Sequence, residues 1–231
     1  LEWLNIPYTG TGVQGSAIGM DKVKTKQIWQ GSDLPTAPYR IVSKDSNIED
    51  VVAELGLPLI IKPVHEGSSI GMSKVEKVED FANAVAKATA HDDIVMAEKW
   101  ITGREFTIVL LNGQALPIIR LEPPKDVAFY DYEAKYQRND VQYGIPCGLS
   151  AVEEQQLQAL ALRAFQAVGA SGWGRIDAMQ DEKGNFWLLE VNTVPGMTSH
   201  SLVPKAANAV GYSFDELCVA ILAQTLTGEA H

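Results

Sequence analysis

The sequence predicts an α+β fold with mainly antiparallel strands. Residues 105–120 have a hairpin pattern about Asn112-Gly113, a dipeptide that favours a tight two-residue turn. A second hairpin pattern covers 174–192, where two strand-like runs flank a short polar turn. Residues 151–168 show the apolar spacing of an amphipathic helix. Hairpins combined with such helices favour antiparallel sheets covered by helices.

The composition limits the class of protein. The chain has 231 residues, of which 46% are hydrophobic, enough for one large domain or two small lobes. Its net charge of −10 argues against a nucleic-acid partner, because phosphate contacts need clustered Lys and Arg. No apolar run reaches the roughly 20 residues of a membrane span, so no membrane partner is expected. Cys147 and Cys218 lack disulfide or metal spacing, which favours a reduced, cytoplasmic protein.

The first half of the chain alternates short helices and strands. After a glycine-rich stretch at 10–19, residues 21–30 have helical composition, with Asp21 as the expected N-cap. Residues 57–64 form an apolar strand that contains Lys62. The next elements are a glycine-serine loop that leads into a strand at 65–75, a helix at 78–90 and a strand at 94–100.

The second half contains a long segment without periodicity. Residues 122–149 are charged and rich in Tyr, and so long an irregular connection is usually functional or disordered. The helix at 151–168 follows, and the stretch Gly169 to Gly172 ends it. After the second hairpin, helical stretches are expected at 202–210 and 214–226.

The second hairpin carries polar residues where a buried strand would prefer Val or Ile. For a turn at Asp181–Gly184, simple pairing sets Arg175 opposite Glu190 and Asp177 opposite Leu188. Because side chains alternate between faces, one face is then apolar, with Ile176, Ala178, Leu189 and Val191. The other face is polar, with Arg175, Asp177, Glu190 and Asn192.

The polar face has two interpretations. Two carboxylates and an amide oxygen suit Mg²⁺, and Arg175 beside them would stabilise a developing anion. The alternative is a solvated outer face with an Arg–Glu pair across the strands. The Pro-Gly loop after the hairpin, which is rich in hydroxyls and backbone donors, favours the first because it could hold an anionic substrate.

Two further segments suit a nucleotide. Lys62 ends an apolar strand, where an unpaired ammonium is costly, although a lysine extending toward water is the alternative. The small residues of the loop 66–71 let its backbone N–H groups approach a polyphosphate, although the loop could also be a plain turn. Neither a P-loop nor a dinucleotide glycine motif is present. Around 97–107, Glu98 and Glu105 could meet an amine and ribose hydroxyls, or could be solvated.

Six segments together resemble the D-alanine–D-alanine ligase family of the ATP-grasp superfamily. In chain order they are "GMDKVKTKQIW", "LIIKPVHEGSSIGMSKV", "AEKWITGREFT", "FYDYEAKY", "GWGRIDAM" and "LLEVNTVPGMTSHSLVP". The resemblance implies an ATP-grasp fold, in which two α+β lobes with mainly antiparallel sheets enclose the nucleotide. It divides the chain into a linker from an absent N-terminal domain, a central lobe, and a C-terminal lobe with a mobile lid at 122–149. The three parts are 1–20, 21–104 and 105–231.

The resemblance also implies a binding site for ATP and Mg²⁺ or Mn²⁺. The groups near the phosphates would be Lys22, Lys62 and Lys135, with Gly67 and Ser69 in a loop that folds over them. The adenosine would meet Glu98, Lys99, Ile101, Glu105 and Phe129. Two metal ions would be held by Asp177, Glu190 and Asn192.

The remaining implied roles concern D-alanine. Arg175 and the backbone N–H of Gly196 would form an oxyanion site. Ser201 and Leu202 would meet the carboxylate of the second D-alanine. Tyr136 at the lid tip would meet Ser68 and close the site. The resemblance further implies a homodimer, formed largely through the absent domain.

The implied reaction ligates two D-alanines through an acyl phosphate, for peptidoglycan precursors. Val194 stands where many family members have Ser, which we regard as tolerable. Two alternatives stay open: an ATP-grasp enzyme for another acid and nucleophile, such as D-lactate or D-serine, and a nucleotide-binding module without activity. The sequence begins at Leu1 as if in mid-domain, and a chain that truly began there would be expected to bind nucleotide yet ligate poorly.

Overall fold

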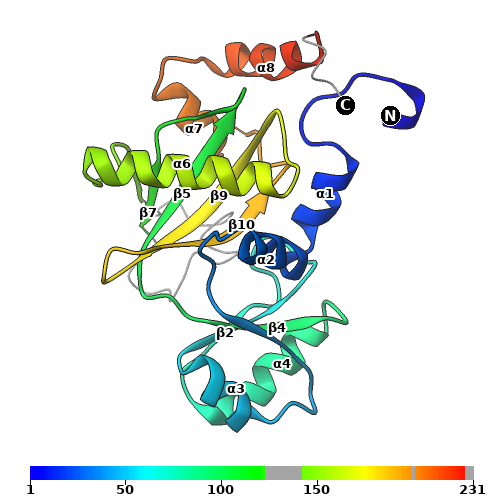
Figure 1. The fold of residues 1–231 in the computed structure, drawn as a ribbon, viewed down its shortest axis with the longest axis vertical. Helices are drawn as coiled ribbons and strands as arrows, with labels where there is room; N and C mark the ends of the chain where they lie inside the picture. The colour runs from blue at the N-terminus through cyan, green and yellow to red at the C-terminus, as the bar shows by residue number, and fades with distance from the viewer. Residues whose placement is uncertain (123–141, 199–200, 227–231) are drawn as a thin grey trace.

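The computed structural model describes residues 1–122, 142–198 and 201–226, and confirms the α+β class (Figure 1). Within these residues the strands form a four-stranded and a six-stranded sheet, and every strand pair within the two sheets is antiparallel. Figure 1 shows them as separate layers, with α6 crossing the large sheet and α3 and α4 on the small one.

The small sheet has the strand order β1-β4-β2-β3. Its elements are β1 (Tyr39–Val42), α3 (Ile48–Leu55), β2 (Leu59–Pro63), β3 (Ser73–Val75), η2 (Val78–Asp80), α4 (Phe81–Thr89) and β4 (Val95–Lys99). Leu59 and Ile61 pack against α3 and α4, together with apolar residues of those helices. Because side chains alternate along β2, Ile60 and Lys62 face away from the helices. One face of the small sheet therefore packs against α3 and α4, and its other face is directed toward the large lobe.

The large sheet has the order β10-β9-β5-β7-β8, with β6 paired to β5. Its elements are β5 (Gly103–Leu111), β6 (Gln114–Ala115), β7 (Ile119–Glu122), β8 (Gln142–Gly144), α6 (Ala151–Ala167), β9 (Trp173–Asp181) and β10 (Phe186–Asn192). The predicted turn at Asn112-Gly113 is confirmed, since both residues have positive φ, as a tight hairpin of this kind requires. The even-numbered residues of β5 from Phe106 to Leu110 pack under α6.

The other face of the large sheet is only partly covered. At one end, Val109 and Leu111 pack against α7 (Leu202–Asn208) and α8 (Phe214–Ala223), which η3 (Gln224–Leu226) follows. Glu105 and Thr107 precede them on the same face of β5 and line a cleft instead. One strand thus contributes to two apolar cores and to the cleft, depending only on position and parity.

The N-terminal region, predicted to be a linker, contains two short helices. It contains η1 (Glu2–Leu4) and α1 (Val13–Met20), which contacts β10. Gly15 lets α1 also approach the turn after α6 closely, because a Cβ there would lie 2.5 Å from the Gly169 carbonyl oxygen. The sequence interpretation also omits β1, α3 and β8, and β8 lies inside the segment 122–149 predicted to be irregular. Short elements such as these are stabilised mainly by tertiary packing, which a local pattern does not report.

The segment α2 (Lys22–Gly31) has the predicted N-cap, since Asp21 accepts a hydrogen bond from the Lys24 N–H. The predicted division places this helix in the small lobe. The structure instead buries Trp29 in the core of the large lobe, where its indole N–H donates to the Ala164 carbonyl at 2.9 Å. The division into 1–20, 21–104 and 105–231 otherwise stays a prediction.

The register of the second hairpin differs from the simple pairing. Asp177 pairs with Glu190 and Arg175 with Asn192, whereas Ala178 pairs with Leu188. A bulge between Leu188 and Glu190 accounts for the shift. Leu189 is the extra residue, without a partner in β9. The backbone N–H of Leu188 donates to the Pro35 carbonyl at 2.9 Å, on the side of β10 away from β9.

The bulge corrects one residue of the predicted apolar face. Leu188, and not Leu189, is fully buried in the core, while Leu189 lines the cleft. The predicted polar face is confirmed, since Arg175, Asp177, Glu190 and Asn192 all line the cleft. A bulge lets Leu188 and Val191, three residues apart, both face the core.

This register makes the two neighbouring leucines unequal. We expect Leu188→Ala to reduce the free energy of unfolding by about 2–5 kcal/mol, because it empties a buried site. Leu189→Ala is the matched control and should cost far less. Urea denaturation of both variants measures the difference, and equal losses would contradict the bulged register.

Candidate active site

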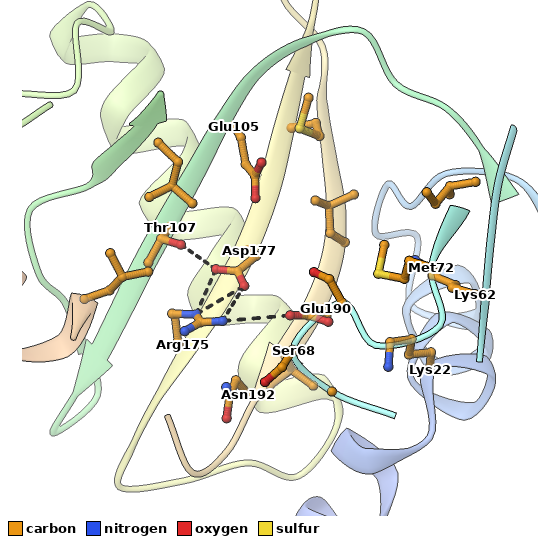
Figure 2. A pocket seen from close by; sticks show the side chains of 18 of the residues that line it. Lys22, Lys62, Ser68, Met72, Glu105, Thr107, Arg175, Asp177, Glu190 and Asn192 are labelled. Carbon is orange, nitrogen blue, oxygen red and sulfur yellow. Dashed lines mark hydrogen bonds and ion pairs between the residues drawn. The ribbon is translucent and has the colours of Figure 1, made fainter. Parts of the chain in front are cut away.

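The described residues enclose a cleft of about 1140 Å³ between the two sheets. One wall comes from β2, β4 and the loop 66–71, and the other from β5, β9 and β10. Figure 2 shows Lys22 and Lys62 on one side of this cavity and Asp177 on the other. The cleft therefore has a cationic wall and an acidic wall facing each other.

The acidic wall centres on Asp177. Its carboxylate accepts hydrogen bonds from the Arg175 guanidinium at 2.7–3.1 Å and from the Thr107 hydroxyl at 2.5 Å. Arg175 also lies 3.8 Å from Glu190 (Figure 2). Asn192 completes the face, and its amide oxygen accepts from the Val194 N–H at 3.1 Å. A guanidinium between the two acids shows that positive charge is stabilised at this place.

The cationic wall rests on a buried group of three charges, Lys26, Lys62 and Glu98. One Glu98 oxygen lies 2.9 Å from the Lys26 ammonium and 3.0 Å from that of Lys62. Lys26 is fully buried and Glu98 is 2% exposed. Two cations and one anion leave a net positive charge, which favours an anionic ligand beside Lys62.

The pKa directions in this group follow from burial and pairing. Burial lowers the pKa of Lys26 to about 8, although the Glu98 carboxylate favours its charged form. Burial alone would raise the pKa of Glu98, but the two neighbouring lysines outweigh it and the pKa is lowered. Lys26 is further held by the Thr36 hydroxyl at 2.5 Å. Glu98 is therefore an anion whose charge is committed to the lysines.

The loop 66–71 closes one side of the cleft in an unusual conformation. Ser68 and Ser69 have φ of 53° and 61°, in the left-handed region that non-glycine residues rarely adopt. Gly71 follows with φ of 70°, and a Cβ there would meet the Pro63 ring at 2.8 Å. Such strain is typical of segments that bind ligands.

Most of the predicted site residues lie together. The structure places these described members at the cleft: Lys22, Lys62, Gly67, Ser68, Ser69, Glu98, Lys99, Ile101, Glu105, Arg175, Asp177, Glu190, Asn192, Gly196, Ser201 and Leu202. Gly196 approaches Ser201 so closely that a Cβ would lie 2.9 Å from the Ser201 hydroxyl. Phe129, Lys135 and Tyr136, with most of the segment 122–149, lie outside the described residues.

Three neighbours of the site are absent from the sequence prediction. Thr107 pairs with Asp177 across the strands, and the alternation of β5 could have indicated it. Lys26 follows Lys22 by four residues, a spacing that puts both on one side of a helix. His65 has no comparable signal, because its partners come from distant parts of the chain.

Comparison with known proteins agrees with this geometry. Residues 28–223 match the family model described as D-ala D-ala ligase C-terminus. A D-alanine–D-alanine ligase of Acinetobacter baumannii (strain ATCC 17978) is 84% identical over 230 residues, which is 100% of this chain and 75% of the relative. The chain belongs to the D-alanine–D-alanine ligase family. A Psychrobacter family member is 65% identical over 226 residues, covering 98% of this chain and 68% of its own.

Solved structures of the family share the fold. The D-alanine–D-alanine ligase of Bacillus anthracis superimposes with a TM-score of 0.86 at 33% identity, covering 98% of this chain and 73% of that one. Its complex with ATP gives 0.84 at 29% identity, covering 98% and 72%. The ATP-grasp fold predicted by the resemblance is thereby confirmed. Among the described residues, no helix is long and apolar enough to cross a membrane.

The buried charges predict unequal effects of two substitutions. Glu98→Gln leaves Lys26 and Lys62 buried without their anion, so we expect a loss of about 3–5 kcal/mol in unfolding free energy. Lys26→Met leaves Glu98 paired with Lys62 and should cost less than half as much. Chemical denaturation compares the two, and a larger loss for Lys26→Met would contradict the shared role of Glu98.

Proposed function

We propose that this protein joins two D-alanine molecules at the expense of ATP, giving D-alanyl-D-alanine for peptidoglycan precursors. The observation that carries this function is the cleft between the two sheets, in which Lys22 and Lys62 face the polar side of the second hairpin. A polyphosphate needs cations on one side and a metal-binding acidic group on the other. Family membership supplies the substrate, because the relatives are named for the D-alanine ligation.

ATP is the nucleotide that the cleft fits. The ATP complex of the Bacillus anthracis relative supports this assignment. In our proposal, the phosphates lie by Lys22, Lys62 and the loop 66–71, where the buried group has one excess positive charge. The adenine lies by Lys99 and Ile101, next to the buried Glu98, and the ribose by Glu105.

The acidic wall fits Mg²⁺ or Mn²⁺. Asp177 and Glu190 pair directly across the strands, and Asn192 adds an amide oxygen two residues on. Hard oxygen donors with few carboxylates suit Mg²⁺, which keeps water and phosphate oxygens in its shell. We propose that these three residues hold the metal, which neutralises phosphate charge when bound. The use of two ions stays a prediction.

The chemistry proceeds in two steps. The carboxylate of the first D-alanine attacks the γ-phosphorus of ATP, which gives an acyl phosphate and ADP. The amine of the second D-alanine then attacks the acyl carbon, loses a proton, and phosphate leaves from the tetrahedral intermediate. Arg175 is placed to stabilise the developing anion, and positioning with charge neutralisation supplies most of the catalysis.

Further roles are proposed on the resemblance. Gly196 would add an N–H to the oxyanion site, and Ser201 and Leu202 would meet the carboxylate of the second D-alanine. Tyr136 would close the site over Ser68, and a closed lid would exclude water from the acyl phosphate. A homodimer and a cytoplasmic location stay predictions of the sequence.

The reaction and its metal site are tested together. The protein should form D-alanyl-D-alanine and release phosphate in equal amounts with D-alanine as the sole amino acid. Glu190→Gln removes a charge at nearly constant volume. We expect more than about a 100-fold loss of turnover, because even residues that only hydrogen-bond to metal ligands change affinity or activity by up to about that factor. Circular dichroism should show an unchanged fold.

Other outcomes favour the alternatives. Faster turnover with D-lactate or D-serine as acceptor would indicate a different ligase. ATP binding without turnover would favour a non-enzymatic module. Unchanged ligation by Glu190→Gln would discredit the metal assignment.

Thr107 is predicted to support the metal through Asp177. Thr107→Val keeps the shape but removes the hydroxyl that donates to the Asp177 carboxylate, so we expect about a 10- to 100-fold weaker apparent Mg²⁺ affinity. Thr107→Ser keeps the hydroxyl and should restore most of that affinity. Titration of Mg²⁺ against ATP binding measures it, and equal behaviour of the two variants would argue against this role.

A further inference from the structure

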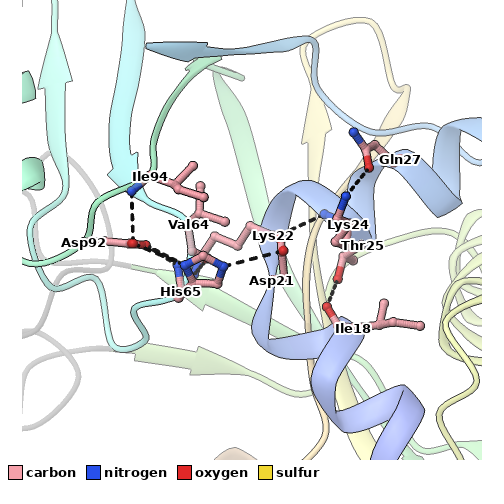
Figure 3. Close-up of polar contacts among 10 residues, drawn as sticks. All are labelled: Ile18, Asp21, Lys22, Lys24, Thr25, Gln27, Val64, His65, Asp92 and Ile94. Carbon is pink, nitrogen blue, oxygen red and sulfur yellow. Dashed lines mark hydrogen bonds and ion pairs between the residues drawn. The ribbon is translucent and has the colours of Figure 1, made fainter. Parts of the chain in front are cut away.

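A second charged cluster lies outside the substrate-contacting residues described above. The ring of His65 sits between two carboxylates, with Nδ1 at 3.0 Å from Asp92 and Nε2 at 3.5 Å from Asp21 (Figure 3). The backbone N–H of His65 also donates to Asp92 at 2.7 Å. The two carboxylates come from segments about 70 residues apart in the sequence, so the ring connects distant parts of the chain.

The cluster joins three chain segments. Asp21 is the N-cap of α2, and His65 follows the end of β2. Asp92 lies in the turn between α4 and β4, where it also accepts from the Ile94 N–H at 3.1 Å. We call this cluster of Asp21, His65 and Asp92 the histidine junction. It is the place where α2, β2 and the α4–β4 turn meet.

The histidine junction adjoins both phosphate-binding candidates. Lys22 directly follows Asp21, and the loop 66–71 directly follows His65. The Lys22 N–H donates to the Val64 carbonyl at 3.3 Å, and its ammonium donates to the carbonyls of Val64 and Glu66. The residue Lys22 and the loop 66–71 are therefore each one peptide bond from the histidine junction, and the Lys22 ammonium is bonded to the loop at Glu66.

We propose that His65, as a cation shared by Asp21 and Asp92, is a positioning residue that holds Lys22 and the loop 66–71 in the arrangement that receives the ATP phosphates. This inference rests on the proposed function. His65 lines the edge of the cleft, and the inference assigns it no direct contact with substrate. It acts by fixing two segments whose relative place would otherwise depend on the exposed start of a helix and a strained loop.

Charge explains why a histidine serves this purpose. The hydrogen bond to Asp92 raises the pKa of His65 above its usual 6.5, against burial, and both carboxylates favour the charged ring. Other charged or titratable groups beside the junction include the sequence neighbours Lys22, Glu66, His91 and Asp93, and Tyr39, whose hydroxyl interacts with the Asp21 charge. Asp92 keeps a lowered pKa, because hydrogen bonds from the backbone and from His65 outweigh its burial.

The raised pKa of His65 decides the direction of the pH effect. A base whose pKa is raised in the folded protein contributes its full stabilisation below the ordinary pKa. That contribution is lost as pH rises through the raised value. The junction is thus complete below the ordinary pKa of histidine, and its cation is lost as pH rises through the raised pKa. We expect ATP affinity to weaken across that interval.

The experiment compares Mg-ATP binding by the wild type and three variants between about pH 6 and about pH 9. His65→Gln keeps a polar side chain but no charge, and His65→Arg keeps a permanent cation. His91→Gln is the matched control, because His91 is exposed and adjacent to Asp92. Affinities are taken as ratios to the wild type at each pH, so the titration of ATP itself cancels.

We expect His65→Gln to bind about tenfold more weakly at the acidic end and to approach the wild type at the alkaline end. His65→Arg should bind well throughout and lose the slope. His91→Gln should follow the wild type. An NMR titration should place the His65 pKa above 6.5 and lower it in Asp92→Asn.

Several outcomes would overturn the inference. A His65→Gln variant with wild-type affinity and slope removes the positioning role. A uniform loss at every pH shows that the residue only supports the fold. Absence of Mg-ATP binding by the wild type would refute the proposed function and the inference with it, whereas normal wild-type binding with an insensitive variant refutes the inference alone.

Discussion

The structure of the cleft depends on one buried carboxylate, that of Glu98, which pairs with two lysines from other elements. Glu98 lies on β4, Lys62 on β2 and Lys26 on α2, so a single anion connects the small sheet to a helix that packs in the large lobe. Removing these charges from water costs free energy that only close pairing offsets. The single Glu98 carboxylate pairs with two ammonium groups, which leaves one excess positive charge. Lys62 brings that charge to the cleft. The same contact that joins the lobes therefore prepares the site for an anionic substrate.

The helix α2 contacts both lobes, because the spacing of its residues places Trp29 and Lys26 on different faces. Trp29 anchors its end under α6, while Lys26 and Lys22 point toward the small sheet and the cleft. Its first turn is fixed by Asp21, both as an N-cap and in the histidine junction. Figure 1 shows α2 between the two sheets, which is the place where one element can set the distance between them. The position of the Lys22 ammonium thus depends on the packing of Trp29 at the other end of α2.

The opposite wall depends on a bulge. A regular hairpin would put Leu188 and Glu190 on the same face, so burying Leu188 would draw the acid toward the core. The extra residue reverses the parity, and the core keeps Leu188 while the cleft keeps Glu190 and Asn192. Pairing of Glu190 with Asp177 then follows directly. Backbone irregularity next to a binding site is here the device that aims the oxygen donors.

The sequence by itself determined the fold class, the Asn112-Gly113 turn and the sharing of one face by Arg175, Asp177, Glu190 and Asn192. These features depend on residues close in sequence and on a side-chain period of two, which local patterns report directly. Tertiary structure alone decided the bulge, the short elements β1, α3 and β8, and the partners of Lys26, Glu98 and His65. Each of these depends on contacts between residues far apart in the chain. A charge looks solvated in sequence until the fold brings its counter-charge within about 3 Å.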